Sequence, residues 1–263
     1  MKFRNLSDYI TYLLSRGELI LKKASALELL DKSDAAIRNS IKRQAHNKKL
    51  LPLFRGHYLI IPPEYASLGF VPPELFIDDL MKGVRASYYI GLLSAASFYG
   101  SSHQAAQTFQ VMVNRRLKPI VSGRSKIVFY YNRKLQDVSI QQLKTDRGPI
   151  TVSTPEATAF DLIRYFHQSG NLSHIATVLG ELAERLNEKK LKKLSHVYPV
   201  VCMQRLGYLM DLTGNNKVTR GLAEAVKDLN PPYVALRSKK ERSYFEKDLK
   251  WHLLINERIE SDL

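Results

Sequence analysis

Apolar residues recur every three or four positions at the start of the chain, and this spacing predicts a helix over residues 6–15. Gly17 is expected to end that helix. The apolar run at 19–21 predicts a short strand, and a second short amphipathic helix should follow, with Ala24, Leu27 and Leu30, together with Leu29, as its apolar residues. The chain therefore opens as helix, strand and helix.

A third helix is predicted directly after this one. Ser33 is well placed as its N-cap, and Asp34 suits the positive end of a helix. Ile37, Ile41 and Ala45 fall on one side. The opposite side carries small, amide and cationic residues, namely Ala35, Ala36, Asn39, Lys42, Arg43 and His46. Such a face fits the major groove of DNA, although the same pattern is typical of an ordinary amphipathic helix whose charges face water.

The segment after this helix favours the DNA-binding interpretation. Residues 50–54 and 57–61 are β-prone runs separated by Arg55-Gly56, which predicts a hairpin with a basic tip. Two helices, a basic second helix and a hairpin, in that order, are typical of a winged helix-turn-helix. In such a domain the tip lies beside the recognition helix, where Arg55 and His57 could reach a phosphate or the minor groove.

Prolines predict the end of this first domain. Pro62-Pro63 and Pro72-Pro73 enclose a short segment that can extend neither a helix nor a central strand. We therefore expect a DNA-binding domain at 1–63, a linker at 64–73 and a larger domain at 74–263. Residues 1–63 hold 12 Lys and Arg against 5 Asp and Glu, a net charge of +7.

The larger domain mixes helical and β-prone segments, so the predicted fold class is α+β: a winged helix-turn-helix followed by a mixed α/β domain with a small antiparallel sheet. One helix is expected over 87–99, and Ser153 with Glu156 has the spacing of a capping box at the start of another. The expected strands are 109–113, 126–131, 138–142 and 150–152, with further helices over 74–82, 172–186 and 199–212 and strands near 233–236 and 251–255.

Net charge and cysteine content narrow the class of protein. The 263 residues include 40 Lys and Arg against 25 Asp and Glu, a formal charge of +15, which attracts polyanions such as nucleic acids. Cys202 is the single cysteine, so an intramolecular disulfide framework is excluded and a reducing cytoplasm is expected. No secretory signal or membrane span is predicted.

Enzyme classes fit the sequence less well. A nucleotidyltransferase needs Gly-Ser at a helix start and two metal-binding carboxylates on the next strand; Gly100-Ser101 is present, but the strand FQVMVNRR carries no acid. A metal-dependent nuclease would need Glu-x-Lys on a strand, and Glu188 lies in a helical run. Cys202 has no adjacent base and is interpreted as a buried thiol. We expect no catalytic residue, metal or cofactor.

Three segments carry a family resemblance: YYIGLLSAASFYGSSHQ, STPEATAFDLI and MQRLGYLMDLTG. With the predicted winged helix, they make the chain resemble the AbiEi family of antitoxins and transcriptional regulators from type IV toxin-antitoxin systems, which are related to abortive phage infection. Members often have His before the glycine that is Gly100 here, whereas this chain has Tyr99. These motifs consist mostly of core and turn residues.

The resemblance implies a function and partners. The first domain would bind an inverted repeat in its own promoter and repress the operon. The second would counteract a nucleotidyltransferase toxin without forming a stable complex with it. The basic composition leaves two alternatives, a module that binds an acidic protein and an RNA-binding module; strong salt-dependent binding to promoter DNA would separate the first from a DNA-binding regulator.

The predicted DNA contacts divide by role. Ala35, Ala36, Asn39 and Arg43 are predicted to contact bases, because small residues allow close approach, Asn can bridge adenine and Arg can bridge guanine. The residues predicted to contact phosphates are Arg38, Lys42, His46, Lys48, Lys49, Arg55 and His57.

Overall fold

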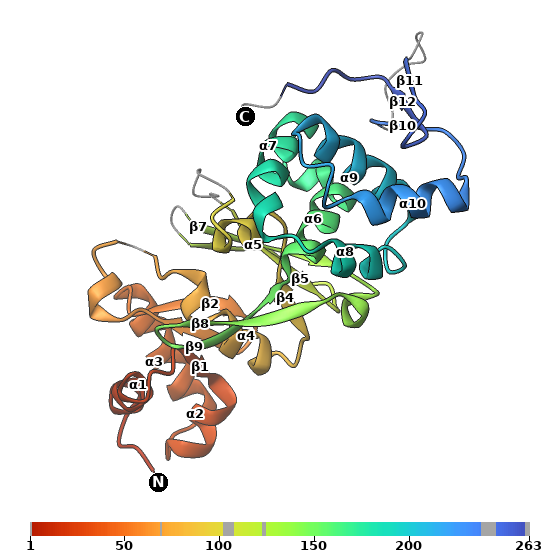
Figure 1. Ribbon diagram of the computed structural model, residues 1–263. Helices are drawn as coiled ribbons and strands as arrows, with labels where there is room; N and C mark the ends of the chain where they lie inside the picture. The colour runs from red at the N-terminus through yellow and green to blue at the C-terminus, as the bar shows by residue number, and fades with distance from the viewer. Residues whose placement is uncertain (1, 69, 102–107, 123–124, 238–245, 261–263) are drawn as a thin grey trace. The chain divides into compact units, whose positions relative to one another are not determined.

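A computed structural model describes residues 2–68, 70–101, 108–122, 125–237 and 246–260 (Figure 1). The chain forms two compact units. Unit 1 comprises residues 1–89, 107–135 and 142–151, and unit 2 comprises 90–106, 136–141 and 152–263. The charged run Ser238 to Arg242 lies outside the described residues.

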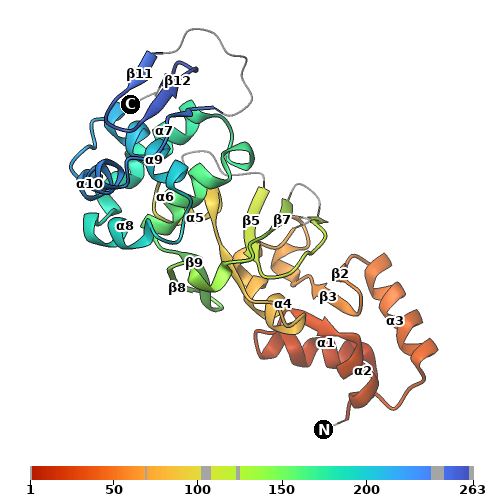
Figure 2. The same cartoon turned by 90° about the vertical axis from the view of Figure 1, so that its right-hand side faces the viewer.

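Unit 1 begins with the predicted succession of elements, α1 (Leu6–Ser15), β1 (Ile20–Lys22), α2 (Lys23–Leu29), α3 (Asp34–His46), β2 (Leu50–Phe54) and β3 (His57–Ile60). The strands pair antiparallel in the order β1-β3-β2, with Ile20 opposite Leu59 and Leu51 opposite Leu59 from the other side. Figure 2 shows α3 beside the β2–β3 hairpin. The helix over residues 6–15 is confirmed to the residue, and Gly17 follows it with φ of 73°.

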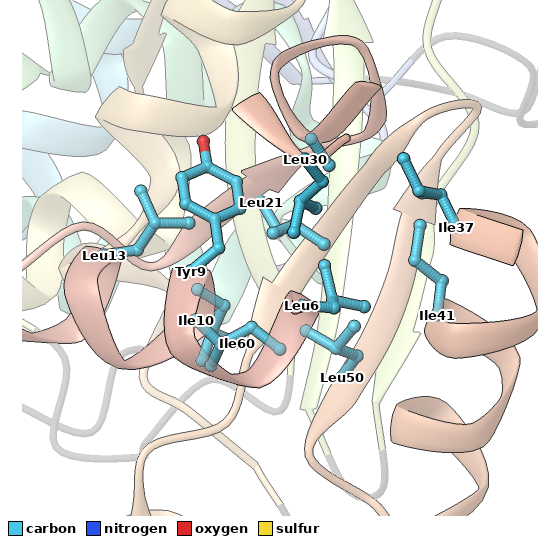
Figure 3. Close-up of a cluster of buried hydrophobic side chains, with 11 residues drawn as sticks. Leu6, Tyr9, Ile10, Leu13, Leu21, Leu30, Ile37, Ile41, Leu50 and Ile60 are labelled. Atoms are coloured by element: carbon cyan, nitrogen blue, oxygen red, sulfur yellow. The ribbon is translucent and has the colours of Figure 1, made fainter. Parts of the chain in front are cut away.

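An apolar cluster holds these elements together (Figure 3). Leu6 and Ile10 of α1 pack with Leu50 of β2, and Ile37 and Ile41 of α3 complete the cluster. The apolar side predicted for α2 is wrong at Ala24 and Leu27, which are exposed, whereas Leu30 is buried as predicted. Ala26 is the buried residue of the helix itself. The orientation of α2 is fixed by its two ends, since β1 precedes it directly and Leu30 pairs with Phe3 after it.

The segment predicted to link two domains, residues 64–73, lies inside unit 1. It contains two single-turn helices, η1 (Pro63–Tyr65) and η2 (Pro73–Leu75), and leads into α4 (Ile77–Gly83). Glu64 pairs with Arg147 at 3.4 Å. Phe54 in the hairpin lies 5.7 Å, ring centre to ring centre, from Phe129. Long-range contacts of this kind extend unit 1 beyond the prolines.

The main sheet has six strands, β4 (Tyr88–Ile90), β5 (Thr108–Val113), β6 (Ile120–Ser122), β7 (Ser125–Tyr131), β8 (Ile140–Thr145) and β9 (Gly148–Ser153). Their hydrogen-bonded order is β6-β7-β5-β4-β9-β8, and the division into units passes through β4, β8 and β9.

The predicted antiparallel sheet is wrong, because β5 runs parallel to β7 and β4 runs parallel to β9. The strand β6 was not expected; it pairs antiparallel with β7 and returns the chain, so β7 starts at the same end of the sheet as β5.

The helix predicted over 87–99 begins later than predicted. Residues 88–90 form β4, and only Leu92–Phe98 are helical, as α5. Gly91 separates the two with φ of −129° and ψ of −175°, which is extended backbone that cannot belong to a helix. The β-prone Tyr-Tyr-Ile sequence therefore pairs with the sheet, and local helical spacing does not decide its structure.

Unit 2 is mainly helical. The helices after α5 are α6 (Pro155–Arg164), η4 (Phe166–Gln168), α7 (Leu172–Leu182), η5 (Ala183–Arg185), α8 (Glu188–Leu194), α9 (Val200–Leu212) and α10 (Arg220–Leu229). The last of these was not predicted. A small sheet in the order β10-β12-β11 follows, formed by β10 (Val234–Ala235), β11 (Glu246–Asp248) and β12 (Leu253–Ile255). The η3 turn (Leu135–Asp137) lies between β7 and β8.

The capping box predicted at the start of α6 is wrong. Thr154 is the N-cap, and its Oγ1 accepts from the amide of Ala157 at 3.4 Å. Ser153 is buried at the end of β9, where its hydroxyl lies 2.7 Å from that of Thr158. Glu156 is also buried, and it accepts from the amide of Asn187 at 3.0 Å. Glu156 therefore joins α6 to the start of α8.

Candidate nucleic-acid interface

The ends of α3 are fixed by local hydrogen bonds. Ser33 caps the helix as predicted, and its Oγ accepts from the amide of Ala36 at 3.3 Å. At the other end Lys48 adopts φ of 55°, the left-handed conformation that usually requires glycine. The amide of Lys49 then returns to the carbonyl of Gln44 at 2.9 Å. The chain can therefore turn directly from α3 into β2.

One side of α3 is anchored in the apolar cluster. Ile37 and Ile41 are almost fully buried there (Figure 3). Gln44 is buried on the same side, and its Nε2 donates to Ser7 Oγ of α1 at 2.9 Å. The sequence interpretation missed Gln44 because it is polar. Its spacing of three from Ile41 and seven from Ile37 was the available signal.

The opposite side of α3 faces solvent. The predicted contact residues that are exposed there, or just after the helix, are Ala35, Arg38, Asn39, Lys42, Arg43, His46, Lys48 and Lys49. Ala36 is half-buried. The exposed side therefore offers small, amide and cationic side chains, while the anchored side holds the helix in place.

Asp34, at the start of α3, forms ion pairs with two neighbouring cations. It forms ion pairs with Lys23 of α2 and, at 2.8 Å, with Arg38 one turn along the helix. The hydrogen bond from Lys23 lowers the pKa of Asp34, and the nearby Arg38 charge acts in the same direction. Within the described part of the chain, Lys42 and Arg43 form no ion pair. Their charges are thus left for an external anion, whereas that of Arg38 is partly neutralised.

The β2–β3 hairpin turns at Arg55 and Gly56. Gly56 has φ of 79°, which favours glycine, and its carbonyl accepts from the amide of Lys23 at 2.8 Å. Arg55 is exposed at the tip. His57 is half-buried, its Nδ1 lies 3.2 Å from the carbonyl of Arg55, and its ring lies so close to Gly83 that a Cβ there would meet Cδ2 at 3.1 Å. His57 therefore packs within unit 1, and its phosphate contact stays a prediction.

The positive charge is concentrated in unit 1. By sequence, unit 1 holds 23 Lys and Arg against 10 Asp and Glu, whereas unit 2 holds 17 against 15. Unit 1 thus carries +13 of the total +15. The unit that contains α3 and the hairpin is the one that attracts a polyanion.

The Gly-Ser pair that a nucleotidyltransferase would need at a helix start lies instead at the end of a helix. Gly100 has φ of 77° and follows α5, and the amide of Ser101 donates to the carbonyl of Ala96 at 3.0 Å. Gly100 and Ser101 thus end α5. Nucleotide phosphates bind at a helix start, where amides are free.

Cys202 lies in the first turn of α9 and is buried. Burial raises the pKa of its thiol to about 11, and the nearby Arg164 and Arg205 only partly oppose this. A nucleophilic cysteine needs the opposite shift. Among the described residues, no three His, Cys, Asp or Glu side chains are grouped so that they could hold a metal ion.

We expect Cys202 to resist alkylation in the folded protein. The rise in the pKa of Cys202 from 9.0 to about 11 lowers the thiolate fraction at pH 8 about 100-fold. Burial also restricts access of the reagent to the sulfur. Because the pKa of Cys202 is higher in the folded than in the unfolded protein, its protonated thiol contributes fully to the free energy of unfolding below pH 9.0. That contribution is lost as the pH rises toward about 11. Labelling with iodoacetamide followed by mass spectrometry measures this, since the chain has one cysteine.

The same labelling in guanidinium chloride is the control and should be fast. Rapid labelling of the native protein at pH 8 would contradict the assignment of Cys202 as a protonated structural thiol.

Comparison with known proteins identifies the second part of the chain. Residues 89–212 match the model of the AbiEi antitoxin C-terminal domain. This segment belongs to the AbiEi antitoxin family. The resemblance drawn from the sequence motifs is therefore confirmed for this segment. The match supports the role of an antitoxin in a toxin-antitoxin system, which implies a toxin as partner.

Solved structures add a comparison of fold. The crystal structure of the RV2827C protein from Mycobacterium tuberculosis superposes with a TM-score of 0.70 over 97% of this chain and 92% of that one, at 14% identity. The crystal structure of an antigenic nucleotidyltransferase-like protein from Paracoccidioides brasiliensis matches 54% of this chain and 89% of its own at 9% identity, with a TM-score of only 0.34.

A search of curated protein sequences found no match. Within the described residues, no helix is long and apolar enough to cross a membrane.

Proposed function

We propose that this AbiEi antitoxin is also a DNA-binding autorepressor, with residues 1–63 acting as a winged helix-turn-helix. The observation that carries the proposal is the exposed side of α3. It presents Ala35, Asn39 and Arg43 to solvent while Ile37 and Ile41 anchor the helix. An anchored helix with such a face can enter the major groove, which is wide enough to admit it.

The hairpin supports the same interpretation. It lies beside α3 and carries exposed Arg55 at its tip (Figure 2). In this proposal Asn39 and Arg43 read base edges and Ala35 and Ala36 permit close approach. The phosphate contacts are Arg38, Lys42, His46, Lys48, Lys49, Arg55 and His57, which position the protein without specifying sequence.

The target in this proposal is a palindromic operator in the promoter of the protein's own operon. Its toxin is a nucleotidyltransferase, neutralised without a stable complex, as the AbiEi family implies. The protein itself is not an enzyme in this proposal; Gly100 and Ser101 at the end of α5, together with the protonated Cys202, support that view.

A bacterial strain that carries a promoter reporter and the gene adjacent to this one tests both autorepression and neutralisation of the toxin. If the adjacent gene encodes the toxin, wild-type protein is expected to lower reporter expression and to restore growth. A variant that ends at residue 73 lacks the matched segment 89–212, together with the part of unit 1 that follows residue 73, and should fail to restore growth. Unchanged reporter expression with wild-type protein would reject autorepression, and growth arrest despite its expression would reject neutralisation of that toxin.

The runner-up is a protein-interaction module whose basic surface meets an acidic partner. The observation in its favour is the net charge of +13 on unit 1, which does not by itself select nucleic acid. Salt dependence separates the two, because binding to duplex DNA releases condensed counterions and weakens steeply with salt.

A further inference from the structure

A groove in unit 1 lies between α1 and the segments that follow α3 and β3. It has a volume of about 560 Å³, which is within the range of about 300 to 1,000 Å³ typical of small-molecule sites. Every residue that lines it falls between Ser7 and Ala66 of the chain. The groove is therefore internal to unit 1, and it adjoins the end of the helix that carries the proposed base contacts.

One side of α1 forms a wall of this groove. Ser7, Thr11 and Leu14 line it at spacings of four and three, which places them on the same side of the helix. From Ser7 to Leu14 that side is about 10 Å long, at about 1.5 Å per residue. The buried side chains of Ile10 and Ile60 also line the groove and form an apolar base (Figure 3). The groove therefore suits an extended apolar body.

Hydrogen-bond donors lie at one end of the groove, where α3 meets α1. Gln44 is 7% exposed, lines the groove, and donates from its Nε2 to Ser7 Oγ at 2.9 Å. An amide nitrogen carries two hydrogens and a hydroxyl carries one. Among the described residues, the second hydrogen of Gln44 Nε2 and the hydroxyl hydrogen of Ser7 have no acceptor. Two donors are thus available to a ligand at this end.

Two cations stand at the same end of the groove. Lys48 and Lys49 follow α3, line the groove and are exposed, and the amide of Lys49 donates to the carbonyl of Gln44 at 2.9 Å. Within the part of the chain that the structure describes, neither lysine forms an ion pair. None of the described lining residues is Asp or Glu. Donors and cations beside an apolar base select an anionic head group on an apolar body, because an ionised carboxylate only accepts hydrogen bonds.

We propose that the groove binds a small carboxylate with an apolar body about 10 Å long, and that this ligand weakens binding to DNA. The carboxylate accepts from Ser7 and Gln44 and pairs with Lys48 or Lys49, while the body covers the apolar base. The effect on DNA rests on the proposed function, in which both lysines contact phosphates. A carboxylate held between these lysines neutralises them, so the ligand and the DNA backbone compete for the same charges.

Octanoate is the probe, because it joins a carboxylate to an extended apolar chain, and 1-octanol is its neutral analogue. T11W fills the groove from α1, and A66W fills it from the segment after β3; both residues are exposed, so neither replacement disturbs a buried side chain. S15W is the matched control, because Ser15 is exposed on α1 and is not among the lining residues. Circular dichroism of the full-length variants verifies folding.

The ligand site is measured without DNA. Isothermal titration calorimetry gives the Kd of octanoate for the full chain. At ten times that Kd, octanoate should raise the Tm of the wild type and of S15W by about 3 to 6 °C in scanning calorimetry. The same concentration of 1-octanol should raise the Tm less, because it offers no charge to the lysines. Octanoate should leave the Tm of T11W and A66W unchanged.

The effect on DNA is measured by fluorescence anisotropy, with a duplex that the wild type selects from a random pool. Octanoate should lower the affinity of the wild type and of S15W roughly 10-fold at low salt. The slope of log affinity against log salt should fall by up to about 2, at about 0.9 per lost phosphate contact. T11W and A66W should bind the duplex as the wild type does, with or without octanoate.

A wild-type protein that shows no rise in Tm with octanoate would overturn the ligand site, and so would an equal rise in T11W and A66W. A change from dimer to monomer in T11W but not in S15W, seen by sedimentation, would assign the groove to a second copy of the chain instead. Loss of toxin neutralisation confined to T11W and A66W would assign it to the toxin. Either result overturns the proposal.

The outcomes also separate this proposal from the proposed function. Octanoate binding that leaves the affinity for the selected duplex unchanged would overturn the regulation of DNA binding, while the assignment of α3 stands. If the wild type selects no duplex but octanoate still raises its Tm, the proposed function fails at α3 and the carboxylate site is supported.

Discussion

The double variant N39A/R43A is expected to lose most of its specific binding to the operator. Each good bidentate contact to a base contributes about 1 to 3 kcal/mol, so the pair should cost about 2 to 6 kcal/mol, or roughly 30-fold to 10⁴-fold in affinity. Affinity for scrambled DNA should fall far less, because the phosphate contacts remain. Fluorescence anisotropy with both duplexes measures the two affinities.

The fold should tolerate this change. Asn39 and Arg43 are exposed, whereas the residues that anchor α3, Ile37, Ile41 and Gln44, are untouched. Alanine also favours the helical state. Thermal unfolding of the variant should therefore match that of the wild type, which separates a binding defect from a folding defect.

N216A/K217A is the matched control. It removes one exposed amide and one exposed cation from unit 2, as the double variant removes an amide and a cation from α3. Operator affinity of this control should equal that of the wild type. If N39A/R43A retained wild-type affinity and discrimination, the assignment of α3 as the recognition helix would be wrong.

The second large effect is expected from G207A in α9. A Cβ at Gly207 would lie 2.1 Å from Cη2 of Trp251, far inside contact distance. Trp251 is fully buried, its Nε1 donates to Asp211 Oδ2 at 2.7 Å, and its amide donates to Asp248 Oδ1 at 2.7 Å. The backbone amide and the ring nitrogen of Trp251 are both hydrogen-bonded, so the ring cannot move aside without losing its bond to Asp211.

We expect G207A to lower the free energy of unfolding by about 3 kcal/mol, at the upper end for overpacking a core. For a protein of this size that corresponds to a fall in Tm of about 6 to 12 °C. Differential scanning calorimetry of the full chain measures it. The better helix propensity of alanine, about 1 kcal/mol, offsets only part of the clash.

G221A in α10 is the matched control within the same unit. There the nearest atom to the new Cβ is Lys192 Cδ at 3.0 Å, on a flexible side chain that is about half exposed. We expect a change within about 1 kcal/mol of the wild type. Equal stability of G207A and G221A would mean that Trp251 does not pack on α9 as described.

Local patterns accounted for much of the candidate interface. Ser33 as N-cap, the apolar spacing of Ile37 and Ile41, and the Arg55-Gly56 turn are each specified by residues a few positions apart. Interactions of that range are encoded in sequence spacing, so the start and the two sides of α3 could be predicted. The family motifs likewise lie in contiguous segments and were recognisable before the fold was known.

The predictions from local pattern were wrong where a residue makes its hydrogen bonds to a segment far away in the sequence. Residues 88–90 have helical spacing but pair in a sheet. The hydroxyl of Ser153 donates to the carbonyl of Ile90, 63 positions earlier, and Thr154 caps α6 instead. Gln44 could not be assigned to the core from its polarity alone, because its partner Ser7 lies 37 positions earlier.

The sequence by itself determined the charge of the chain, the composition of α3 and the antitoxin motifs, since these depend on residue identity and local periodicity. Only the tertiary structure decided which residues enclose the groove beside α1. Thr11 and Ala66 are far apart in sequence, and they line the same groove because β3 pairs with β1 and so returns the chain to α1. A binding cavity depends on distances in space, so it exists only once strand order and direction are fixed.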